Sequence, residues 1–308
     1  RCRYVNPRSE RQLADVPDQP CGLCMLPGGV LAITYTTREY NTGRETAVKF
    51  VAARNDSDPQ ALAACRASSL AARRFEWLMG LALTNDGLLV CSLHDVSNAL
   101  YKFAKDGSMD EMATVPVLAN YDQGFKGCAV HQQTQRTYAL VGDDDEGRNA
   151  LVLLDANLQI IATVEVATGN GPEDIDDDDD YDPIRDVAVH GDHVIILTSN
   201  GHGKGSGLRL LDLDGRFLRT IAAGKFQDPR AVAVSHGRAF VIDGDDDYDD
   251  DVAGNVLYII DIQSGDILQN VCVDLKGEVS AIIIDGDDIF IASFGTSKVV
   301  VLQFAGMI

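Results

Sequence analysis

Three runs of acidic residues are the part of this sequence best suited to chemistry. They are GDDDE from Gly142, EDIDDDDDYD from Glu173 and DGDDDYDDD from Asp243, and together they hold 19 of the 47 Asp and Glu residues. The rest of the chain has nearly equal numbers of acidic and basic residues, so the formal charge of −21 is concentrated in these runs. A local excess of carboxylates indicates binding of cations or of a basic partner.

The oxygen atoms of these runs are hard ligands, and Ca²⁺ takes about six to eight such ligands in irregular geometry. Neither long run is an EF-hand, because Asp179 and Tyr248 stand where that loop requires Gly. Two alternatives are solvated loops with a diffuse counterion cloud, and docking of a basic protein. The predicted Ca²⁺ ligands are Asp143, Asp144, Asp145, Asp174, Asp176, Asp178, Asp180, Asp243, Asp245, Asp247, Asp249 and Asp251.

A repeat of short apolar strands must position these groups. Its first strand occurs six times, at intervals of roughly 45 to 60 residues, which is typical of propeller blades. Small residues alternate with larger ones in these strands, as expected for the innermost strand of a blade. The six strands are CGLCML at 21, MGLALT at 79, KGCAVH at 126, RDVAVH at 185, RAVAVS at 230 and SAIIID at 280.

Each first strand leads through a tight turn to a second, and further turns such as AKDGS and DLDGR predict a third and a fourth. The last unit ends one strand short, while RQLADV at 11–16 is similar to a fourth strand. The sequence therefore predicts an all-β, six-bladed β-propeller of four-stranded antiparallel blades, closed by residues 11–16. Residues 1–10 form an N-terminal arm, and 11–308 form a single domain.

One unit carries a family resemblance. NDGLLVCSLHDVSNALYKFAKDGS, from Asn85, resembles an NHL repeat, with a DG turn, an apolar strand, a polar loop containing Asn and a second strand ending in a DG turn. The resemblance implies a six-bladed ring that binds proteins, sugars or nucleic acids. It also implies that a minority of relatives are metal-dependent hydrolases or lyases.

Connectivity predicts where the acidic runs lie. The loop between the second and third strands of a blade leaves on the same face as the link to the next blade. The first and third runs join second and third strands in blades 3 and 5, and the second run links blade 3 to blade 4. All three are therefore expected on one face, over half of the ring, and we interpret this face as the working surface.

Three basic residues, Lys126, Arg185 and Arg230, open the first strands of blades 3, 4 and 5 near this face. One interpretation is that they pair with acidic residues, and Asp186 next to Arg185 is a ready partner. The other is that they surround the axial opening and hold a carboxylate or phosphate.

An alternative function is a metal-dependent hydrolase, lactonase or lyase with its site at the axial opening. The candidate catalytic residues for that function are Glu76, Asn98 and Glu278. The sequence contains no nucleophile elbow, phosphate loop or Ser/His/Asp arrangement, which favours a binding protein over an enzyme.

The predicted partner is a protein, either a basic one or another copy of the chain, because residues 1–74 are mildly basic while blades 3 to 5 are acidic. Nucleic acid is disfavoured by the negative charge. No apolar run approaches the roughly 20 residues of a membrane span. The first residue is Arg rather than Met, so we expect a processed chain and favour secretion, although the odd number of cysteines argues against it. An intracellular location stays open.

The spacing of Cys21 and Cys24 is that of a redox or zinc pair. Both residues, however, lie in a predicted strand, where positions three apart point to opposite faces. We therefore expect buried free thiols.

Overall fold

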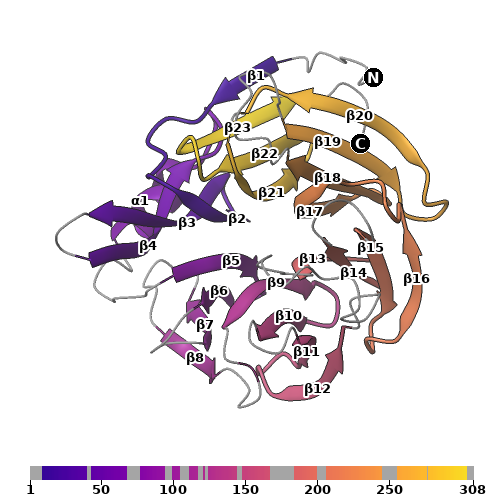
Figure 1. Cartoon of the computed structure of the whole chain (residues 1–308). Coiled ribbons are helices and arrows are strands. Elements are labelled where there is room, and N and C mark those ends of the chain that lie inside the picture. The colour runs from indigo at the N-terminus through magenta and orange to yellow at the C-terminus, as the bar shows by residue number, and fades with distance from the viewer. Residues whose placement is uncertain are drawn as a thin grey trace.

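The protein is a six-bladed β-propeller, as the repeat predicts (Figure 1). The structure, a computed structural model, describes residues 9–39, 43–67, 77–93, 99–104, 111–116, 121, 124–143, 148–166, 184–199, 206–244, 255–275 and 277–303. All six predicted first strands are confirmed, and Figure 1 shows them around the central axis of the ring.

Blades 1 to 3 are made by consecutive segments of the chain. Blade 1 contains β2 (Pro20–Leu26), β3 (Val30–Glu39) and β4 (Gly43–Ala52). Blade 2 contains β5 (Trp77–Leu83), β6 (Gly87–Leu93), β7 (Ala99–Ala104) and β8 (Glu111–Pro116). Blade 3 contains β9 (Phe125–His131), β10 (Arg136–Asp143), β11 (Arg148–Leu154) and β12 (Ile160–Glu165).

Blades 4 to 6 complete the ring. Blade 4 contains β13 (Ile184–His190), β14 (His193–Thr198), β15 (Gly207–Asp212) and β16 (Phe217–Ile221). Blade 5 contains β17 (Asp228–Ser235), β18 (Arg238–Gly244), β19 (Asn255–Asp261) and β20 (Ile267–Val273). Blade 6 contains β21 (Val279–Asp285), β22 (Asp288–Ser293) and β23 (Lys298–Gln303), together with β1 (Ser9–Gln12).

The ring closes through β1, which is the fourth strand of blade 6. It pairs antiparallel with β23, from Ser9 opposite Gln303 to Gln12 opposite Val300. The next residue continues the pairing, since the Leu13 amide donates to the Val299 carbonyl at 3.0 Å. The predicted closure is confirmed, but the strand is Ser9–Gln12 rather than 11–16, so Ser9 and Glu10 belong to blade 6 and not to the predicted N-terminal arm. Closure joins the two ends of the chain in one sheet and removes the seam of the ring.

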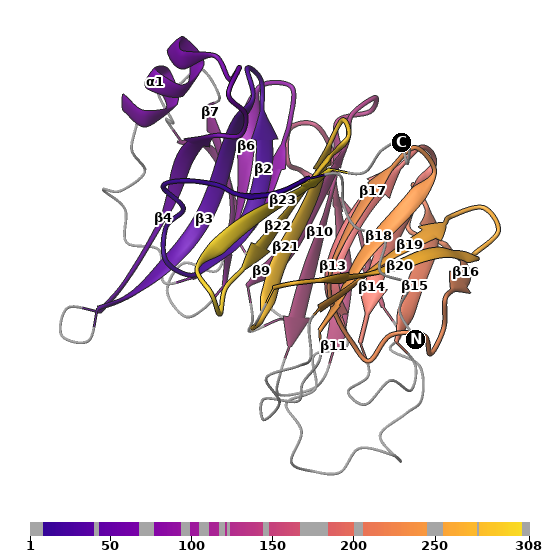
Figure 2. The same cartoon turned by 90° about the horizontal axis from the view of Figure 1, so that it is seen from above.

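Blade 1 differs from the others, because its described part has three strands followed by helix α1 (Pro59–Ala67). Asp58 begins the helix: its side chain accepts the Gln60 amide at 2.8 Å and its carbonyl accepts the Leu62 amide. Pro59 suits the first helical position, where no amide hydrogen is needed. Cys65 is buried and Leu62 partly buried in the core between blades 1 and 2. Figure 2 shows the helix at one end of blade 1.

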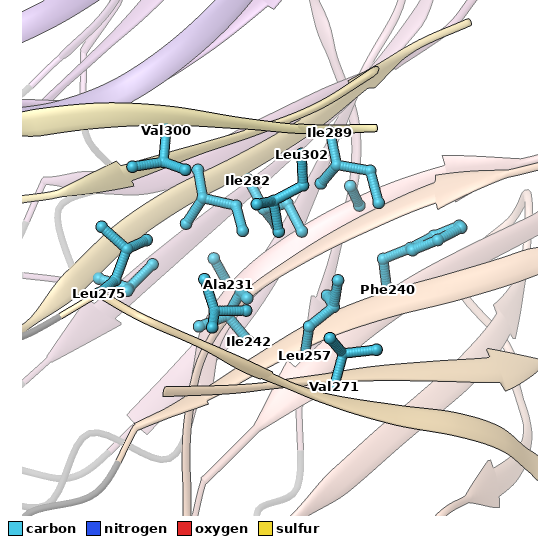
Figure 3. Close-up of a cluster of buried hydrophobic side chains, with 14 of the residues drawn as sticks. Ala231, Phe240, Ile242, Leu257, Val271, Leu275, Ile282, Ile289, Val300 and Leu302 are labelled. Carbon is cyan, nitrogen blue, oxygen red and sulfur yellow. The ribbon is translucent and has the colours of Figure 1, made fainter. Parts of the chain in front are cut away.

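The hydrophobic core lies between neighbouring blades. Figure 3 shows the cluster between blades 5 and 6, where Ile242 and Leu257 of one blade pack against Ile282, Ile289 and Val300 of the next. Each such side chain contributes about 1.5–3 kcal/mol when fully buried. These contacts make every blade depend on its neighbours. No helix in the described ranges is long and apolar enough to cross a bilayer.

The innermost strand of every blade carries an irregularity at the same position, close to its first residue. In each case the pairing with the second strand skips one residue, or two in blade 2. A bulge of this kind leaves the skipped residue outside the ladder and redirects its side chain. The skipped residues, in chain order, are Cys21, Met79 with Gly80, Lys126, Arg185, Arg230 and Ser280.

Candidate functional site

The candidate site is the edge of blades 3 to 5 at which the acidic runs begin and end, called the acidic edge below. β10 ends there at Asp143, opposite Arg148 at the start of β11. β13 begins there at Ile184, opposite Thr198, and β18 ends there at Gly244, opposite Asp228. The inner-strand bulges lie at this same edge, so the recurring cations and the ends of the acidic runs share one face.

Most of the predicted Ca²⁺ ligands lie outside the described residues and stay predictions. Those residues are Asp144, Asp145, Asp174, Asp176, Asp178, Asp180, Asp245, Asp247, Asp249 and Asp251. Asp143 is described as the last residue of β10. Within the described ranges, no group of three or more His, Cys, Asp or Glu side chains is placed to hold a metal ion.

Asp243 is the one predicted ligand whose side chain the structure describes. It is only 5% exposed, and its carboxylate accepts the Gln227 amide at 3.0 Å and the Asp228 amide at 2.8 Å. These hydrogen bonds fix the backbone at the start of β17. Asp243 therefore holds the backbone at the acidic edge in place, and the third acidic run begins at this hydrogen-bonded strand end.

Two of the recurring cations share one buried carboxylate. Arg230 forms an ion pair with Asp228, and the Arg185 guanidinium lies 3.5 Å from the other Asp228 oxygen. Arg230 also contacts Glu278 of blade 6 at 3.3 Å. This network joins blades 4, 5 and 6 at the acidic edge. It supports the interpretation that the arginines pair with acidic residues of the frame.

The Lys126 side chain lies next to Gly142, near the end of β10 in the same blade. A β-carbon on Gly142 would lie 2.6 Å from its ammonium nitrogen, so the Lys126 side chain would have to shift if Gly142 carried a side chain. Lys126 thus lies beside the residue that opens the first acidic run. The three cations occupy the same repeat position, as predicted, and the structure places each of them in a bulge. Their binding of a ligand anion stays a prediction.

Asp186 has a structural role that the sequence pattern did not predict. It follows the bulge in β13, at a position that Gly127, Ala231 and Ala281 occupy in three other blades. Its carboxylate accepts the Val187 amide at 2.8 Å and, from the next blade, the Val232 amide at 2.9 Å.

Desolvation of the partly buried carboxylate raises the pKa of Asp186 to about 6, and the two amide hydrogen bonds offset part of the increase. Asp186 therefore joins the innermost strands of blades 4 and 5 through hydrogen bonds. Arg185 pairs with Asp228 rather than with Asp186, its expected partner. The sequence signal is a lone carboxylate where the other repeats carry small residues.

The residues of the alternative hydrolase site are described only in part. Glu76 and Asn98 lie outside the described ranges, while Glu278 is half exposed and contacts Arg230. The repeat position of Asn98 corresponds to Ser206 in blade 4 and Asn255 in blade 5, by the pairing of second and third strands.

Both equivalents have structural contacts. The Asn255 amide donates to the Leu275 and Gly277 carbonyls at 2.7 and 3.1 Å, and the Ser206 hydroxyl donates to the Phe226 carbonyl at 2.7 Å. In blades 4 and 5 this position therefore holds the link to the next blade.

Cys21 and Cys24 are buried free thiols within β2, as predicted. Burial raises the pKa of Cys21 to about 11 and that of Cys24 to about 12. Thiols with such values remain protonated at neutral pH and are poor nucleophiles and metal ligands.

Known structures that are similar to the whole ring come from proteins with different activities. A chain of hydrazine synthase from Kuenenia stuttgartiensis is similar over 95% of this chain and 97% of its own, with a TM-score of 0.60 and 13% identity. A chain of a nidogen/laminin complex matches over 86% and 84%, with a TM-score of 0.59 and 10% identity.

A catalytically inactive virginiamycin B lyase from Staphylococcus aureus with quinupristin matches over 96% and 98%, with a TM-score of 0.54 and 12% identity. The likeness is one of fold. No protein-family profile matches the sequence, and no curated protein matches it. The six-bladed ring is consistent with the NHL-like character of the repeat.

Proposed function

We propose that this chain is a non-catalytic binding propeller whose acidic edge, over blades 3 to 5, binds Ca²⁺, a basic protein partner, or both. The observation that carries the proposal is the shared location of the strand ends from which the three acidic runs extend. Asp143, Ile184 and Gly244 lie at one edge of three consecutive blades. The runs contain 19 acidic residues and no Lys or Arg, so cations are attracted to a single face.

The hydrogen bonds and ion pairs at the acidic edge support its role as a binding surface. Asp243 is tied to the backbone of Gln227 and Asp228, and Asp228 is tied to Arg230 and Arg185. The runs therefore start from ordered strand ends in which the fold's own cations are already engaged with carboxylates. A bound cation would relieve repulsion among the remaining carboxylates and stabilise the folded state.

We include an extracellular location in the proposal. Calcium sites of extracellular modules bind Ca²⁺ weakly, and the free Ca²⁺ concentration outside cells is high enough to fill them. Involvement of a protein partner is supported in general terms by the fold. One structure with the same architecture is a chain of a nidogen/laminin complex.

Thermal unfolding in chelator, in millimolar Ca²⁺ and in Mg²⁺ or KCl of matched ionic strength tests the calcium arm. Site binding at 100 times the dissociation constant would add about 2.7 kcal/mol to the free energy of unfolding. We expect a rise with Ca²⁺ that the matched salts do not reproduce. A variant with Asp176→Asn, Asp178→Asn and Asp180→Asn should lose it.

The matched control carries the same number of substitutions on the opposite edge. Asp56, Asp192 and Asp287 are exposed residues of turns there, and their replacement by Asn removes the same charge. This control should keep the calcium response. Binding of a fluorescent Lys-rich peptide to the same three proteins tests the partner arm, and it should weaken only in the variant of the acidic run. If neither Ca²⁺ nor the peptide distinguishes the two variants, the acidic edge is not the binding surface.

A further inference from the structure

A second surface, unrelated to the acidic runs, emerges from the exposed apolar side chains. Across the described ranges, every large hydrophobic side chain that is clearly exposed belongs to the outermost strand of a blade. Figure 1 shows these strands, β8, β12, β16 and β20, along the outer circumference of the ring. The residues are Met112, Ile160, Ile161, Phe217, Leu218, Ile267 and Leu268.

A bulge in each outer strand explains the exposure. The pairing with the third strand skips Met112 in blade 2, Ile161 in blade 3, Leu218 in blade 4 and Leu268 in blade 5. A bulge turns the skipped side chain out of the alternating pattern. The four skipped residues are exposed to nearly the same extent, at 50%, 49%, 49% and 52%. The exposure is therefore a repeated feature of the fold rather than a set of separate accidents.

In blades 3 to 5 the bulged residue has an apolar neighbour before it, which makes three exposed pairs in consecutive blades. We call them the apolar rim: Ile160, Ile161, Phe217, Leu218, Ile267 and Leu268. Blade 2 has Glu111 at the position of the neighbour, and β1 of blade 6 reads SERQ. Only half of the ring thus carries the full apolar pattern.

Charged residues are few in these outer strands, although the Arg209 guanidinium of β15 lies over the Phe217 ring at 5.9 Å from its centroid. β20 contains none, and β12 contains only Glu165. In β16 the guanidinium of Arg219 donates to the carbonyls of Ile262 and Gln263 at 2.8 and 2.6 Å, which directs it toward blade 5. Exposed apolar clusters on a soluble protein usually mark an interaction site. The bulges interrupt regular strand pairing, so the occupant packs on side chains rather than adding a strand.

Charge complementarity indicates what occupies the rim. The turns that lead into the three outer strands hold one basic residue, Arg216, and five Asp residues, of which Asp214 already pairs with Arg136 at 3.1 Å. The five are Asp155, Asp212, Asp214, Asp261 and Asp266. Hydrogen bonds from Ser264 keep the pKa of Asp261 below its ordinary value, so this carboxylate is ionised at neutral pH. A second copy would bring another formal charge of −21 against these residues, which disfavours self-association.

We propose that the apolar rim docks a partner protein that presents an apolar face bordered by Lys and Arg. The apolar centre of that face covers the exposed pairs of blades 3 to 5, and its basic border meets the Asp residues of the adjacent turns. This surface consists of residues different from those of the acidic edge. It therefore stands or fails independently of the calcium proposal.

The test uses two labelled synthetic peptides in fluorescence anisotropy at about 150 mM salt, where long-range attraction is screened. One peptide is helical with Leu on one face and Lys on the other, and its counterpart has Ser in place of every Leu. We expect the Leu-containing peptide to bind the whole protein more tightly. Leu218→Asn should weaken that binding about tenfold and leave the Ser peptide unaffected.

Met112→Asn is the matched control, because Met112 occupies the same bulge with the same exposure in blade 2, outside the rim. It should leave both peptides unaffected. Circular dichroism and thermal unfolding establish that both variants are folded, and Ile161→Asn or Leu268→Asn replaces Leu218→Asn if that variant is not. Neutralising Asp176, Asp178 and Asp180 should leave the difference in affinity between the Leu and the Ser peptide unchanged, because the rim sets that difference, and this separates failure at the rim from failure at the acidic edge.

Three results would overturn the proposal. The first is that the Leu peptide fails to bind, or that Leu218→Asn and Met112→Asn affect it equally. The second is a wild-type dimer in sedimentation that Leu218→Asn dissociates, which would assign the rim to a second copy. The third is binding to phosphatidylcholine vesicles that Leu218→Asn abolishes, which would assign it to a lipid surface.

Discussion

Replacing Asp186 with Ala should remove a pH dependence from the free energy of unfolding. Burial raises the pKa of Asp186 to about 6 in the folded protein, from an ordinary value of 3.8. A raised pKa means that the folded state binds the proton more tightly than the unfolded state, so the ionised carboxylate costs stability. The cost is absent below pH 3.8, where both states are protonated, and it is complete above pH 6.

The difference of about two pKa units corresponds to about 3 kcal/mol. The carboxylate also accepts the Val187 and Val232 amides, and Ala would leave both without this acceptor. Each lost acceptor costs about 1–3 kcal/mol, so the variant can be less stable than the wild type in spite of the removed ionisation cost. The prediction therefore concerns the change with pH rather than the absolute stability.

Urea unfolding at intervals from pH 4 to pH 8 measures this change. The free energy of unfolding of the wild type, minus that of Asp186→Ala, should fall by about 2 kcal/mol between pH 4 and pH 7, because the unfolded carboxyl is already more than half ionised at pH 4. The many exposed carboxylates titrate in both proteins and cancel in the difference. Asp192→Ala, in the exposed turn after β13, should show no such fall. A constant difference for Asp186→Ala would refute the assignment of a partly buried, proton-binding carboxylate between blades 4 and 5.

Further predictions concern the closure and the centre of the ring. Arg54 of blade 1 forms ion pairs with Asp285 and with the buried Asp288 of blade 6, at 2.8 and 2.9 Å. Arg54→Ala should lower the free energy of unfolding by about 2 kcal/mol, because Asp288 loses its cation. An unchanged urea midpoint would contradict this role. A β-carbon on Gly22 would lie 2.0 Å from the Met79 carbonyl oxygen, so Gly22→Ala should cost at least about 3 kcal/mol or prevent folding. A β-carbon on Gly244 would lie 3.5 Å from its nearest neighbour, the Asp228 carbonyl oxygen, so Gly244→Ala should cost less than about 1 kcal/mol. Equal losses in the two variants would refute the close approach of blades 1 and 2.

The sequence predicts the ring because its strands and turns repeat locally. The alternation of small and large residues, as in Ala231 to Val234, marks the innermost strand without any knowledge of contacts. The closing strand follows from the missing fourth strand at the other end of the chain. Helix α1 is less visible, because nine residues give little more than two turns of periodicity, and only Asp58 followed by Pro59 signals its start.

The contacts at the site depend on register, which the sequence pattern does not reveal. The recurrence of Lys126, Arg185 and Arg230 is visible in the repeat, but the bulges that carry them arise only when the strands pair. Arg185 contacts Asp228 of the next blade rather than its neighbour Asp186, because packing between blades decides the partner. The outer bulges of the apolar rim likewise depend on pairing, so the exposure of Leu218 could not be predicted from its hydrophobicity.

Two calorimetric titrations of the chelator-treated protein test the central claim most directly, one with Ca²⁺ as the titrant and one with the Lys-rich peptide taken to saturation. The claim is that the acidic edge is the binding surface of the propeller. It predicts saturable binding of Ca²⁺ or peptide to the wild type and to the control with Asn at Asp56, Asp192 and Asp287. It also predicts loss of that binding with Asn at Asp176, Asp178 and Asp180. Equal heats from all three proteins, or no saturable binding of either probe to the wild type, would contradict it.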